Sequence, residues 1–300
     1  MTDHFIQNAL SNGNEGKRWL ESIPSIISKC EEKWSLQVYP PFNLSYNYVA
    51  PVVRSDGTNA VLKIGFPQDR EFRTETEALT IFHGEGVVKL LEADPENSII
   101  LLEQVKPGKP LSEIEDDEEA TRILARVMKK LWKPLPEKHN FITIQEWSTA
   151  IPNLRKDFHG TTGPLPTYLV DKAEHLFYKL IVSSGKSVLV HGDLHHDNVL
   201  SSERDGWLTI DPKGIAAEPA YEVAAMIRNP YEKLKNISHL EPFLRRRIEI
   251  LSKELDIHPK RIHEWCLAQT VLSAVWNVKS TKGADHAIRV AETLEKIKFN

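Results

Sequence analysis

Residues 191–198 read HGDLHHDN, which is the densest polar segment of the chain. The mostly apolar run SVLV precedes it at 187–190, and Val199 and Leu200 follow it, so the segment is predicted to be a loop between two short strands. Three histidines and two aspartates in eight residues cannot all be buried without partners. This loop is therefore the first candidate for a functional site.

Three interpretations of the loop are open. The first is a polar loop whose histidines are satisfied by their neighbours. The second is a metal hydrolase, because His and Asp are good metal ligands, although the residue order is not H-E-x-x-H and the segment is predicted to be a loop rather than a helix. The third is phosphoryl transfer, because His191, Asp193 and Asn198 reproduce the spacing of the kinase catalytic loop.

The third interpretation requires a further carboxylate on a nearby strand to bind Mg²⁺. Asp211 meets this requirement, since it ends the run WLTID (207–211) after an Asp-Gly turn at 205–206. A hairpin from Asn198 to Asp211 would hold the two Mg²⁺ ligands side by side. In this pattern Asp193 accepts the proton of the attacking hydroxyl. The segment 191–211 therefore favours a kinase.

A kinase also needs a lysine that faces the ATP phosphates and a glutamate that pairs with it. Lys63 lies inside the predicted strand 60–64, and Glu75 falls at the centre of the apolar stripe of a predicted helix over 70–83. A carboxylate on an inward face needs a cation, so Lys63 and Glu75 are predicted to pair. The alternatives are a Lys63 that points to water from an edge strand and a Glu75 at a surface boundary.

Hydrophobic periodicity divides the chain into a β-rich part and a helical part. Helices are predicted over 16–36 and 70–83, with strands at 46–49, 52–53, 60–64, 87–91 and 98–102. The segment 103–110 is rich in Pro and Gly and is typical of a linker. Beyond it, helices are predicted over 117–133, 144–158, 166–183, 220–228, 240–255, 259–279 and 284–298, and β-structure at 187–190 and 198–211.

With these residues the chain resembles the aminoglycoside phosphotransferases, in particular the branch of streptomycin 6-phosphotransferase and hydroxyurea phosphotransferase. The resemblance is most specific where the chain reads HGDLHHDNVL (191–200), IDPKG (210–214), EPAYE (218–222) and RNP (228–230). It implies an α+β, bilobal, protein-kinase-like fold. The small β-rich N-terminal lobe (1–104) would hold a leading helix, an antiparallel sheet and one inserted helix, and the larger C-terminal lobe (105–300) would be mainly helical.

The resemblance also implies a role for each residue of the site. Asp193 is the expected catalytic base, and Asn198 and Asp211 are the expected Mg²⁺ ligands. ATP is expected to meet Lys63 and Glu75 at its phosphates and the chain near Glu103 and Val105 at its adenine. His191 and Glu222 are expected to support the catalytic loop rather than to take part in proton transfer.

The implied function is ATP- and Mg²⁺-dependent phosphorylation of a hydroxyl group of a small molecule. Streptomycin and hydroxyurea are the leading acceptors, with antibiotic inactivation as the role. The alternatives are a kinase of another metabolite, such as a sugar or a choline-like molecule, and a non-catalytic nucleotide-binding sensor. The chain lacks G-x-G-x-x-G and reads His-Gly-Asp and Asp-Pro-Lys where protein kinases have His-Arg-Asp and Asp-Phe-Gly, which disfavours a protein substrate.

Composition disfavours several other classes of protein. The 300 residues carry 38 Lys and Arg against 42 Asp and Glu, a balance that is not typical of nucleic-acid binding. No apolar run approaches the roughly 18 residues that cross a bilayer, the N-terminus lacks a secretory signal, and Cys30 and Cys266 have no metal-ligand spacing. Composition therefore favours a cytoplasmic protein without a nucleic-acid or membrane partner. The resemblance adds a small hydroxylated molecule as the expected partner and implies no protein partner.

Three further features have ordinary structural interpretations. The acidic run 113–119 suits the positive end of a helix dipole, with attraction of a cationic acceptor as the alternative. The arginines 245–247 are expected on a solvated helix face, because no aromatic residues interleave with them. Trp265 and Trp276 are expected in the core, with a place in the acceptor pocket as the alternative.

Overall fold

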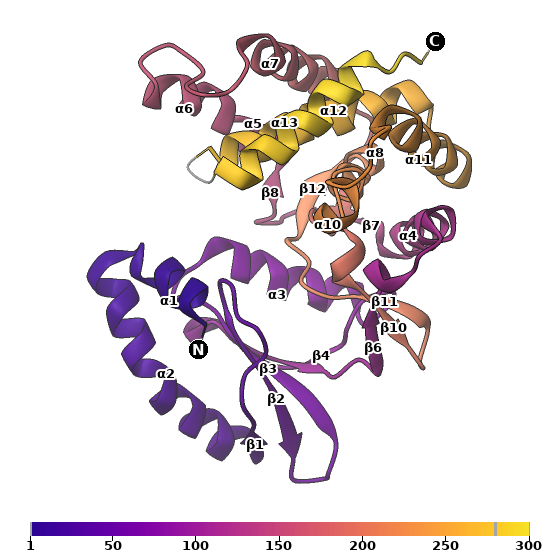
Figure 1. Ribbon diagram of the computed structural model, residues 1–300. Helices are drawn as coiled ribbons and strands as arrows, with labels where there is room; N and C mark the ends of the chain where they lie inside the picture. The colour runs from indigo at the N-terminus through magenta and orange to yellow at the C-terminus, as the bar shows by residue number, and fades with distance from the viewer. Residues whose placement is uncertain (1, 279–280, 300) are drawn as a thin grey trace. The chain divides into compact units, whose positions relative to one another are not determined.

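The computed structural model describes residues 2–278 and 281–299. The chain forms two compact units, Met1–Gly108 and Lys109–Asn300, and the colours of Figure 1 follow the chain from indigo in the first unit to yellow at the end of the second. Each unit has its own hydrophobic core. Within the described residues, no helix combines the length and the apolar character needed to cross a membrane.

The N-terminal unit is built on a five-stranded antiparallel sheet. Its strands lie in the order β1-β2-β3-β5-β4, with bounds β1 Leu36–Val38, β2 Tyr48–Arg54, β3 Asn59–Ile64, β4 Leu90–Asp94 and β5 Ile99–Glu103. The helices are α1 Asp3–Leu10, α2 Gly13–Trp34, α3 Arg70–Phe82 and the short η1 Pro95–Asn97. The strand β6 Pro107–Pro110 spans the boundary between the two units. β3 is the central strand and is hydrogen bonded along both of its edges.

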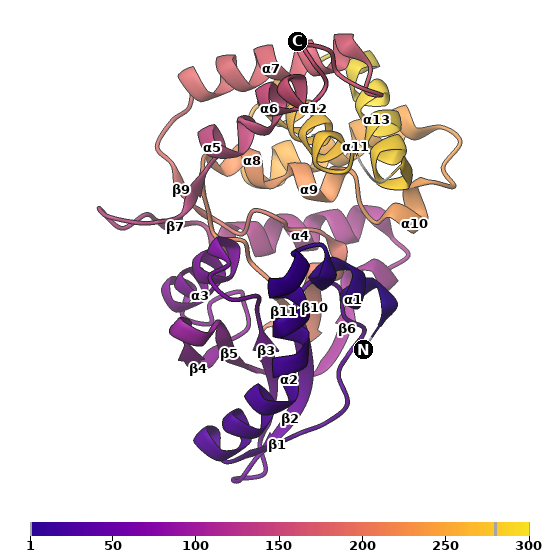
Figure 2. The ribbon, with the colours of Figure 1, turned by 90° about the vertical axis from the view of Figure 1, so that its left-hand side faces the viewer.

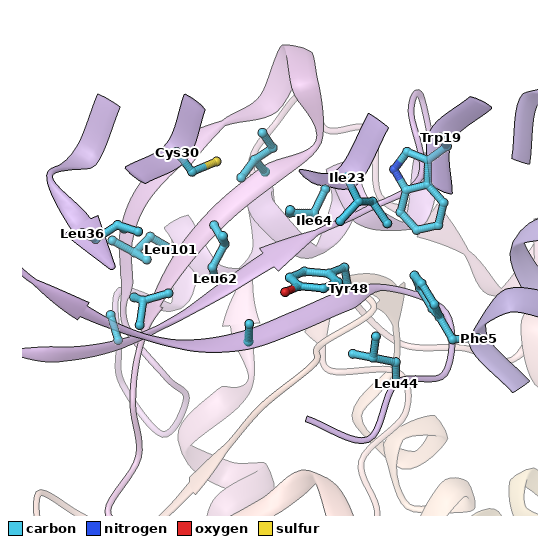
Figure 3. Packing of buried hydrophobic residues seen from close by; sticks show 14 of the residues in the cluster. Phe5, Trp19, Ile23, Cys30, Leu36, Leu44, Tyr48, Leu62, Ile64 and Leu101 are labelled. Atoms are coloured by element: carbon cyan, nitrogen blue, oxygen red, sulfur yellow. The ribbon is translucent and has the colours of Figure 1, made fainter. Parts of the chain in front are cut away.

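Alternation along β3 separates the two faces of this sheet. Leu62 and Ile64 are fully buried in the same cluster as Trp19 and Ile23 of α2 (Figure 3), so α2 covers this face. Successive side chains of a strand point to opposite faces, and Lys63 accordingly points to the other face, where it meets α3. The position of Lys63 between two core residues therefore decides which helix it faces.

Local signals explain where several elements of this unit begin and end. The Asp69 carboxylate caps α3 by accepting the N–H of Glu71 at 2.9 Å. Gly57 has a φ of +81° in the turn between β2 and β3, as predicted for the Asp-Gly pair. Ser35 is left-handed at φ +49° and ends α2, so Leu36 starts β1 and the predicted helix over 16–36 is too long at its end.

The C-terminal unit consists mainly of helices. The long ones are α4 Asp117–Leu131, α7 Thr167–Val182, α11 Leu240–Leu255, α12 Pro259–Trp276 and α13 Thr281–Lys296. The short ones are α5 Ile144–Ser148, α6 Ala150–Asp157, α8 Pro219–Glu222, α9 Ala224–Ile227, α10 Tyr231–Leu234, η2 Leu111–Glu113 and η3 His196–Asn198. One sheet has the order β7-β9-β12-β8, from Lys133–Pro134, Val188–Val190, Ile215–Ala217 and Ile142–Thr143, and β10 Val199–Ser202 pairs with β11 Gly206–Thr209 as a hairpin.

Helix α12 forms the centre of this unit. It contacts α7, α9, α11 and α13 (Figure 2), and its residues 265–275 are all buried. A helix that is buried on every side belongs in a core. Trp265 is fully buried, as predicted, whereas Trp276 at the end of α12 is 43% exposed, so its predicted place in the core is wrong.

The other differences from prediction lie in short or polar elements. The sequence pattern does not reveal α1, because only Phe5 and Ala9 of this helix are buried. It also does not reveal β6, whose Pro and Gly content is typical of a linker, and it places the strand β4 too early, at 87–91. The helices predicted over 144–158 and 220–228 are each two short helices, which meet at Thr149 and Val223. Residue 279, the last of the helix predicted over 259–279, lies outside the described residues.

Candidate active site

The loop HGDLHHDN leaves the end of β9 beside the start of β12. Val190 of β9 pairs with Ile215 of β12 in antiparallel register. Gly192 has a φ of +87°, and a Cβ at this position would lie 2.3 Å from Cγ1 of Ile215, so only glycine fits this turn. The side chain of Asp193, which comes directly after the turn, is 33% exposed and can therefore meet a ligand.

His191 is fully buried and uses its two ring nitrogens inside the protein. Nε2 lies 2.8 Å from the carbonyl oxygen of Ile210, and the N–H of Asp193 donates to Nδ1 at 3.2 Å. These contacts require the neutral tautomer with its proton on Nε2, and burial lowers the pKa of His191 to about 4. The ring therefore ties the loop at 191–198 to residue 210. Because neither nitrogen is available to a metal ion, the metal-hydrolase interpretation loses one of its ligands.

Glu222 of α8 holds the main chain of the same loop. Its carboxylate oxygens accept the N–H of His191 at 2.6 Å and the N–H of Gly192 at 2.9 Å. The residue is 1% exposed, and burial raises the pKa of Glu222 to about 7 although the two N–H donors oppose the rise. A single carboxylate that accepts hydrogen bonds from two consecutive main-chain amides fixes the conformation of the backbone just before Asp193.

The predicted hairpin of β10 and β11 brings Asn198 next to the end of β11. Val199 pairs with Thr209, and the N–H of Ile210 donates to the carbonyl oxygen of Asn198 at 3.0 Å. Asp211 follows at once, with a left-handed φ of +61° that turns the chain out of the strand. The Nδ2 of Asn198 donates to the carbonyl oxygen of Asp193 at 3.0 Å, so the amide oxygen is the atom left for a ligand.

The oxygen atoms of Asn198 and Asp211 fit a magnesium ion. Mg²⁺ prefers oxygen ligands and is usually held by one or two side chains together with waters and the phosphates of the substrate. A carboxylate and an amide oxygen at adjacent ends of one hairpin match this donor set. Within residues 2–278 and 281–299, no group of three or more His, Cys, Asp or Glu side chains is arranged to hold a metal ion.

Arg228, directly after α9, belongs to this site although the sequence analysis assigns it no role. Its Nη2 lies 3.9 Å from Oδ1 of Asp193. Its Nη1 donates to the carbonyl oxygen of Ala224 at 3.1 Å and to Oε1 of Gln269, and the side chain is 12% exposed. The signals in the sequence are a single charge after the apolar run AAMI and the place of Arg228 in the RNP motif at 228–230.

Arg247 contradicts the expected solvated face of α11. Its side chain is 1% exposed, against 36% for Arg245 and 59% for Arg246. Its guanidinium donates to the two carboxylate oxygens of Asp117 at 2.6 and 3.0 Å. Burial favours a higher pKa of Asp117, but Arg247 holds this pKa below its usual range. The acidic run at the start of α4 thus opens a helix, as predicted, and also supplies an internal counter-ion.

His196 is the one histidine of the loop that is buried without a partner among the described residues. It is 2% exposed, and neither ring nitrogen makes a hydrogen bond. Burial and then the positive charge of Arg247 lower the pKa of His196 well below its usual value. The ring is therefore neutral, and His196 differs from His191, whose two ring nitrogens both have partners in the protein.

In the N-terminal unit, Lys63 and Glu75 form a buried ion pair. Nζ lies 2.6 and 2.7 Å from the two oxygens of Glu75, and the residues are 4% and 5% exposed. The alternatives of an edge-strand lysine and a surface glutamate are both wrong, because β3 is central in the sheet and α3 turns Glu75 inward. The ring of Phe72 lies 6.0 Å from Nζ and adds a cation–π contact.

The predicted adenine-binding segment follows the sheet of the same unit. Glu103 ends β5, and its Oε1 accepts the N–H of Lys89 at 2.9 Å. Val105 lies two residues beyond the strand and is half-buried. The N–H of Glu103 also donates to the carbonyl oxygen of Lys89 at 3.0 Å, so the start of this segment is fixed to the residue before β4.

Known proteins with similar sequences are kinases. A family model for the aminoglycoside/hydroxyurea antibiotic resistance kinases matches residues 35–281. The chain is 29% identical to a streptomycin 6-kinase of Streptomyces griseus over 301 residues, which cover 95% of this chain and 94% of that protein.

Solved structures with a similar fold are also kinases. Choline kinase LicA from Streptococcus pneumoniae gives a TM-score of 0.64 at 16% identity, over 93% of this chain and 99% of that chain. A mutant of aminoglycoside phosphotransferase APH(4)-Ia in a ternary complex with ADP and hygromycin B gives a TM-score of 0.64 at 17% identity, over 90% and 97%. At such identities the likeness concerns the fold alone, and it confirms the predicted protein-kinase-like fold.

Proposed function

Because the chain belongs to the aminoglycoside/hydroxyurea antibiotic resistance kinases, we propose that it transfers the γ-phosphoryl group of ATP to a hydroxyl group of an aminoglycoside of the streptomycin type. The similarity to a streptomycin 6-kinase over nearly the whole chain supports this acceptor. The fold shared with a phosphotransferase that was solved with ADP and hygromycin B supports a nucleotide as donor. Hydroxyurea is the second acceptor, since the family includes kinases that act on it.

The observation that carries this proposal is the way in which the loop presents Asp193. Glu222 fixes the two amides before Asp193, and His191 accepts the N–H of Asp193 itself. The main chain is thus held at three consecutive residues while the Asp193 carboxylate stays 33% exposed. A fixed, accessible carboxylate is what a kinase requires to orient an acceptor hydroxyl.

In the proposed reaction, the acceptor hydroxyl oxygen forms a bond to the γ-phosphorus. The bond between this phosphorus and the oxygen that bridges to ADP breaks, and ADP leaves. The hydroxyl proton passes to the Asp193 carboxylate and from there to water. In the largely dissociative transition state of phosphoryl transfer, most of the catalysis comes from positioning and from charge stabilisation rather than from proton removal.

Mg²⁺ and Lys63 have the remaining roles in this proposal. Asn198 and Asp211 would hold Mg²⁺, which neutralises charge on the phosphates when it is bound. Lys63 would contact the phosphates from the N-terminal unit, with its ammonium oriented by Glu75. The main chain near Glu103 and Val105 would meet the adenine. His191 and Glu222 would have supporting roles, because each of them contacts the loop and is buried away from solvent.

The direct test is transfer of ³²P from γ-labelled ATP in the presence of Mg²⁺ to a panel of acceptors: streptomycin, hydroxyurea, other aminoglycosides, choline and simple sugars. Asp193→Asn is expected to lower the rate by about 10²- to 10⁴-fold. Asp197→Asn is the matched control, because this aspartate lies in the same loop with its side chain 55% exposed, and it is expected to keep the wild-type rate.

Labelled streptomycin that disappears in Asp193→Asn and persists in Asp197→Asn would support the proposal. Label on choline or a sugar alone would keep the kinase reaction and refute the aminoglycoside acceptor. Nucleotide binding without transfer to any acceptor would refute the reaction and favour a nucleotide-binding sensor. Equal loss in the two variants would refute the special role of Asp193.

A further inference from the structure

The Arg228 guanidinium lies beside the carboxylate of Asp193 in the interior of the C-terminal unit. Nη1 is occupied by the carbonyl oxygen of Ala224 and by Oε1 of Gln269. Nη2 is directed by these contacts to a position 3.9 Å from Oδ1 of Asp193. This separation is an ion-pair contact without a hydrogen bond, so the carboxylate keeps its lone pairs for an acceptor hydroxyl.

The main chain that carries Arg228 is held by side chains from two other helices. The carbonyl oxygen of Arg228 accepts a hydrogen bond from Nε2 of His286 in α13 at 2.8 Å. Arg247 of α11 donates to the carbonyl oxygens on either side of it, those of Met226, Ile227 and Asn229. A turn whose carbonyl groups are bonded in this way has one conformation, so the position of the Arg228 side chain is set by α11, α12 and α13 together.

Burial of this guanidinium requires a compensating negative charge. Burial lowers the pKa of Arg228, and the charge of Asp193 is the main effect that opposes this change. The carboxylate of Glu222 is not a direct partner, because its two oxygens accept main-chain amides. The Asp193 carboxylate is thus the anion that compensates the buried positive charge of Arg228.

We propose that Arg228 is a positioning residue for the phosphoryl transfer proposed above. It fixes the orientation of the Asp193 carboxylate, and its positive charge reduces the repulsion between this carboxylate and the ATP phosphates. Gln269 acts through Arg228, because its amide oxygen sets the rotation of the guanidinium plane. Since the guanidinium is a rigid fork, it can bond Ala224 and Gln269 on one side while it faces Asp193 on the other. A lysine at this position keeps the charge and loses the fork.

The test measures kcat and KM for ATP in Arg228→Met and Arg228→Lys. Misplacement of a catalytic group costs about 10²-fold in rate, so Arg228→Met is expected to lower kcat by about 100-fold. KM for ATP is expected to rise by a smaller factor, because the Asp193 charge then repels the phosphates without compensation. Arg228→Lys is expected to recover part of the loss, because it restores the charge. A merely structural arginine would instead change thermal stability and leave kcat of the folded fraction unchanged.

The matched control is Arg261→Met. Arg261 is also a partly buried arginine with a carboxylate partner, Glu218, and it donates to the hydroxyl of Ser183 and the carbonyl oxygen of Leu180, but it makes no contact with Asp193 among the described residues. This variant is expected to lower the melting temperature and to keep the wild-type kcat. Equal kcat values for Arg228→Met and the wild-type protein would overturn the inference.

A crystal structure of Arg228→Lys or Arg228→Met provides a readout that does not depend on turnover. The inference requires the Asp193 carboxylate to rotate or to become disordered while the main chain at 191–193, which Glu222 holds, stays in place. An Asp193 side chain that keeps its position without the guanidinium would refute the positioning role. If the wild-type protein transfers no label, the proposed function fails, but this structural outcome still decides the inference about Arg228.

Discussion

Replacing Glu222 with glutamine tests how a buried carboxyl group holds the loop at 191–198. The wild-type side chain accepts the N–H of His191 at 2.6 Å and that of Gly192 at 2.9 Å. A glutamine keeps one acceptor oxygen and turns an NH₂ group toward the other amide, which leaves one buried donor without a partner. Such a donor costs about 1–3 kcal/mol, so Glu222→Gln is expected to lower the free energy of unfolding by this amount near pH 5.

The same comparison has a pH dependence whose sign follows from burial. Burial raises the pKa of Glu222 from 4.5 to about 7 in the folded chain. Between these two values the unfolded chain releases the proton and the folded chain keeps it, so the wild-type stability falls as the pH rises. Each pH unit in this interval costs about 1.4 kcal/mol, which amounts to about 3 kcal/mol over the whole interval. Glutamine does not titrate, so the variant lacks this loss.

The assay is urea unfolding of the two proteins at pH 5, 6, 7 and 8. The destabilisation by Glu222→Gln is expected to be largest at pH 5 and to vanish or change sign by pH 8. Burial lowers the pKa of His191 to about 4, so the free energy of unfolding also falls as the pH drops below 6.5. This contribution is the same in both proteins and cancels in the difference between them. Glu249→Gln, at an exposed position on α11, is the control and should show no such trend. A destabilisation that grows with pH would refute the reasoning, because it would mean that the two amide donors outweigh burial and keep Glu222 ionised.

The other predictions concern the turn before Asp193, the buried arginine pair and the lysine of the N-terminal unit. Gly192→Ala is expected to lower the free energy of unfolding in urea by about 2–4 kcal/mol, because a left-handed conformation is combined with a contact of 2.3 Å to β12. Gly206→Ala is the control: at φ +74° with open space around it, it should lower this free energy by only about 1–2 kcal/mol. Equal costs would contradict the packing argument. Arg247→Met leaves the buried Asp117 with Lys233, at 3.5 Å, as its remaining cation and is expected to cost at most about 3–5 kcal/mol. The double variant with Asp117→Asn should be more stable than the sum of the single effects, and additive effects in the double-mutant cycle would rule out the coupling. Lys63→Met is expected to lower the rate of ³²P transfer by at least about 10²-fold, and a wild-type rate in this variant would exclude Lys63 as a ligand of the phosphates.

Much of the candidate site is predictable because its signals are local. The spacing of His191, Asp193 and Asn198 is a property of one loop, and the turn at 205–206 places Asp211 at the end of the returning strand. The pairing of Lys63 with Glu75 follows from a strand period of two and a helix period of 3.6, because each period turns one charged side chain inward. In all these cases the sequence separation is short or the periodicity is regular.

The residues that the sequence pattern does not reveal depend on contacts between distant segments. Arg247 and Asp117 are 130 positions apart. A period of 3.6 places Arg247 on the same face of α11 as Leu244 and Leu251, but no local signal identifies Asp117 as its partner. Trp276 ends an apolar helix and is nonetheless 43% exposed, because α12 reaches the surface at its last turn. Periodicity along one element indicates which face is turned inward, but it does not show which distant element packs against that face or where the cover ends.

The sequence by itself determined the division into a β-rich and a helical part, the candidate loop at 191–198 and the charged pair of the N-terminal unit, since these follow from periodicity, local spacing and the cost of burying an unpaired charge. The protein-kinase-like fold was implied by the resemblance of these motifs to a known family. The resemblance implied that Glu222 supports the loop, but only the tertiary structure showed that it does so by accepting two main-chain amides. Only the tertiary structure decided that Arg228, carried on a turn fixed by α11 and α13, faces Asp193. The physical reason is that a hydrogen bond or an ion pair depends on distance in space, and helices far apart in the chain meet only when the core has formed.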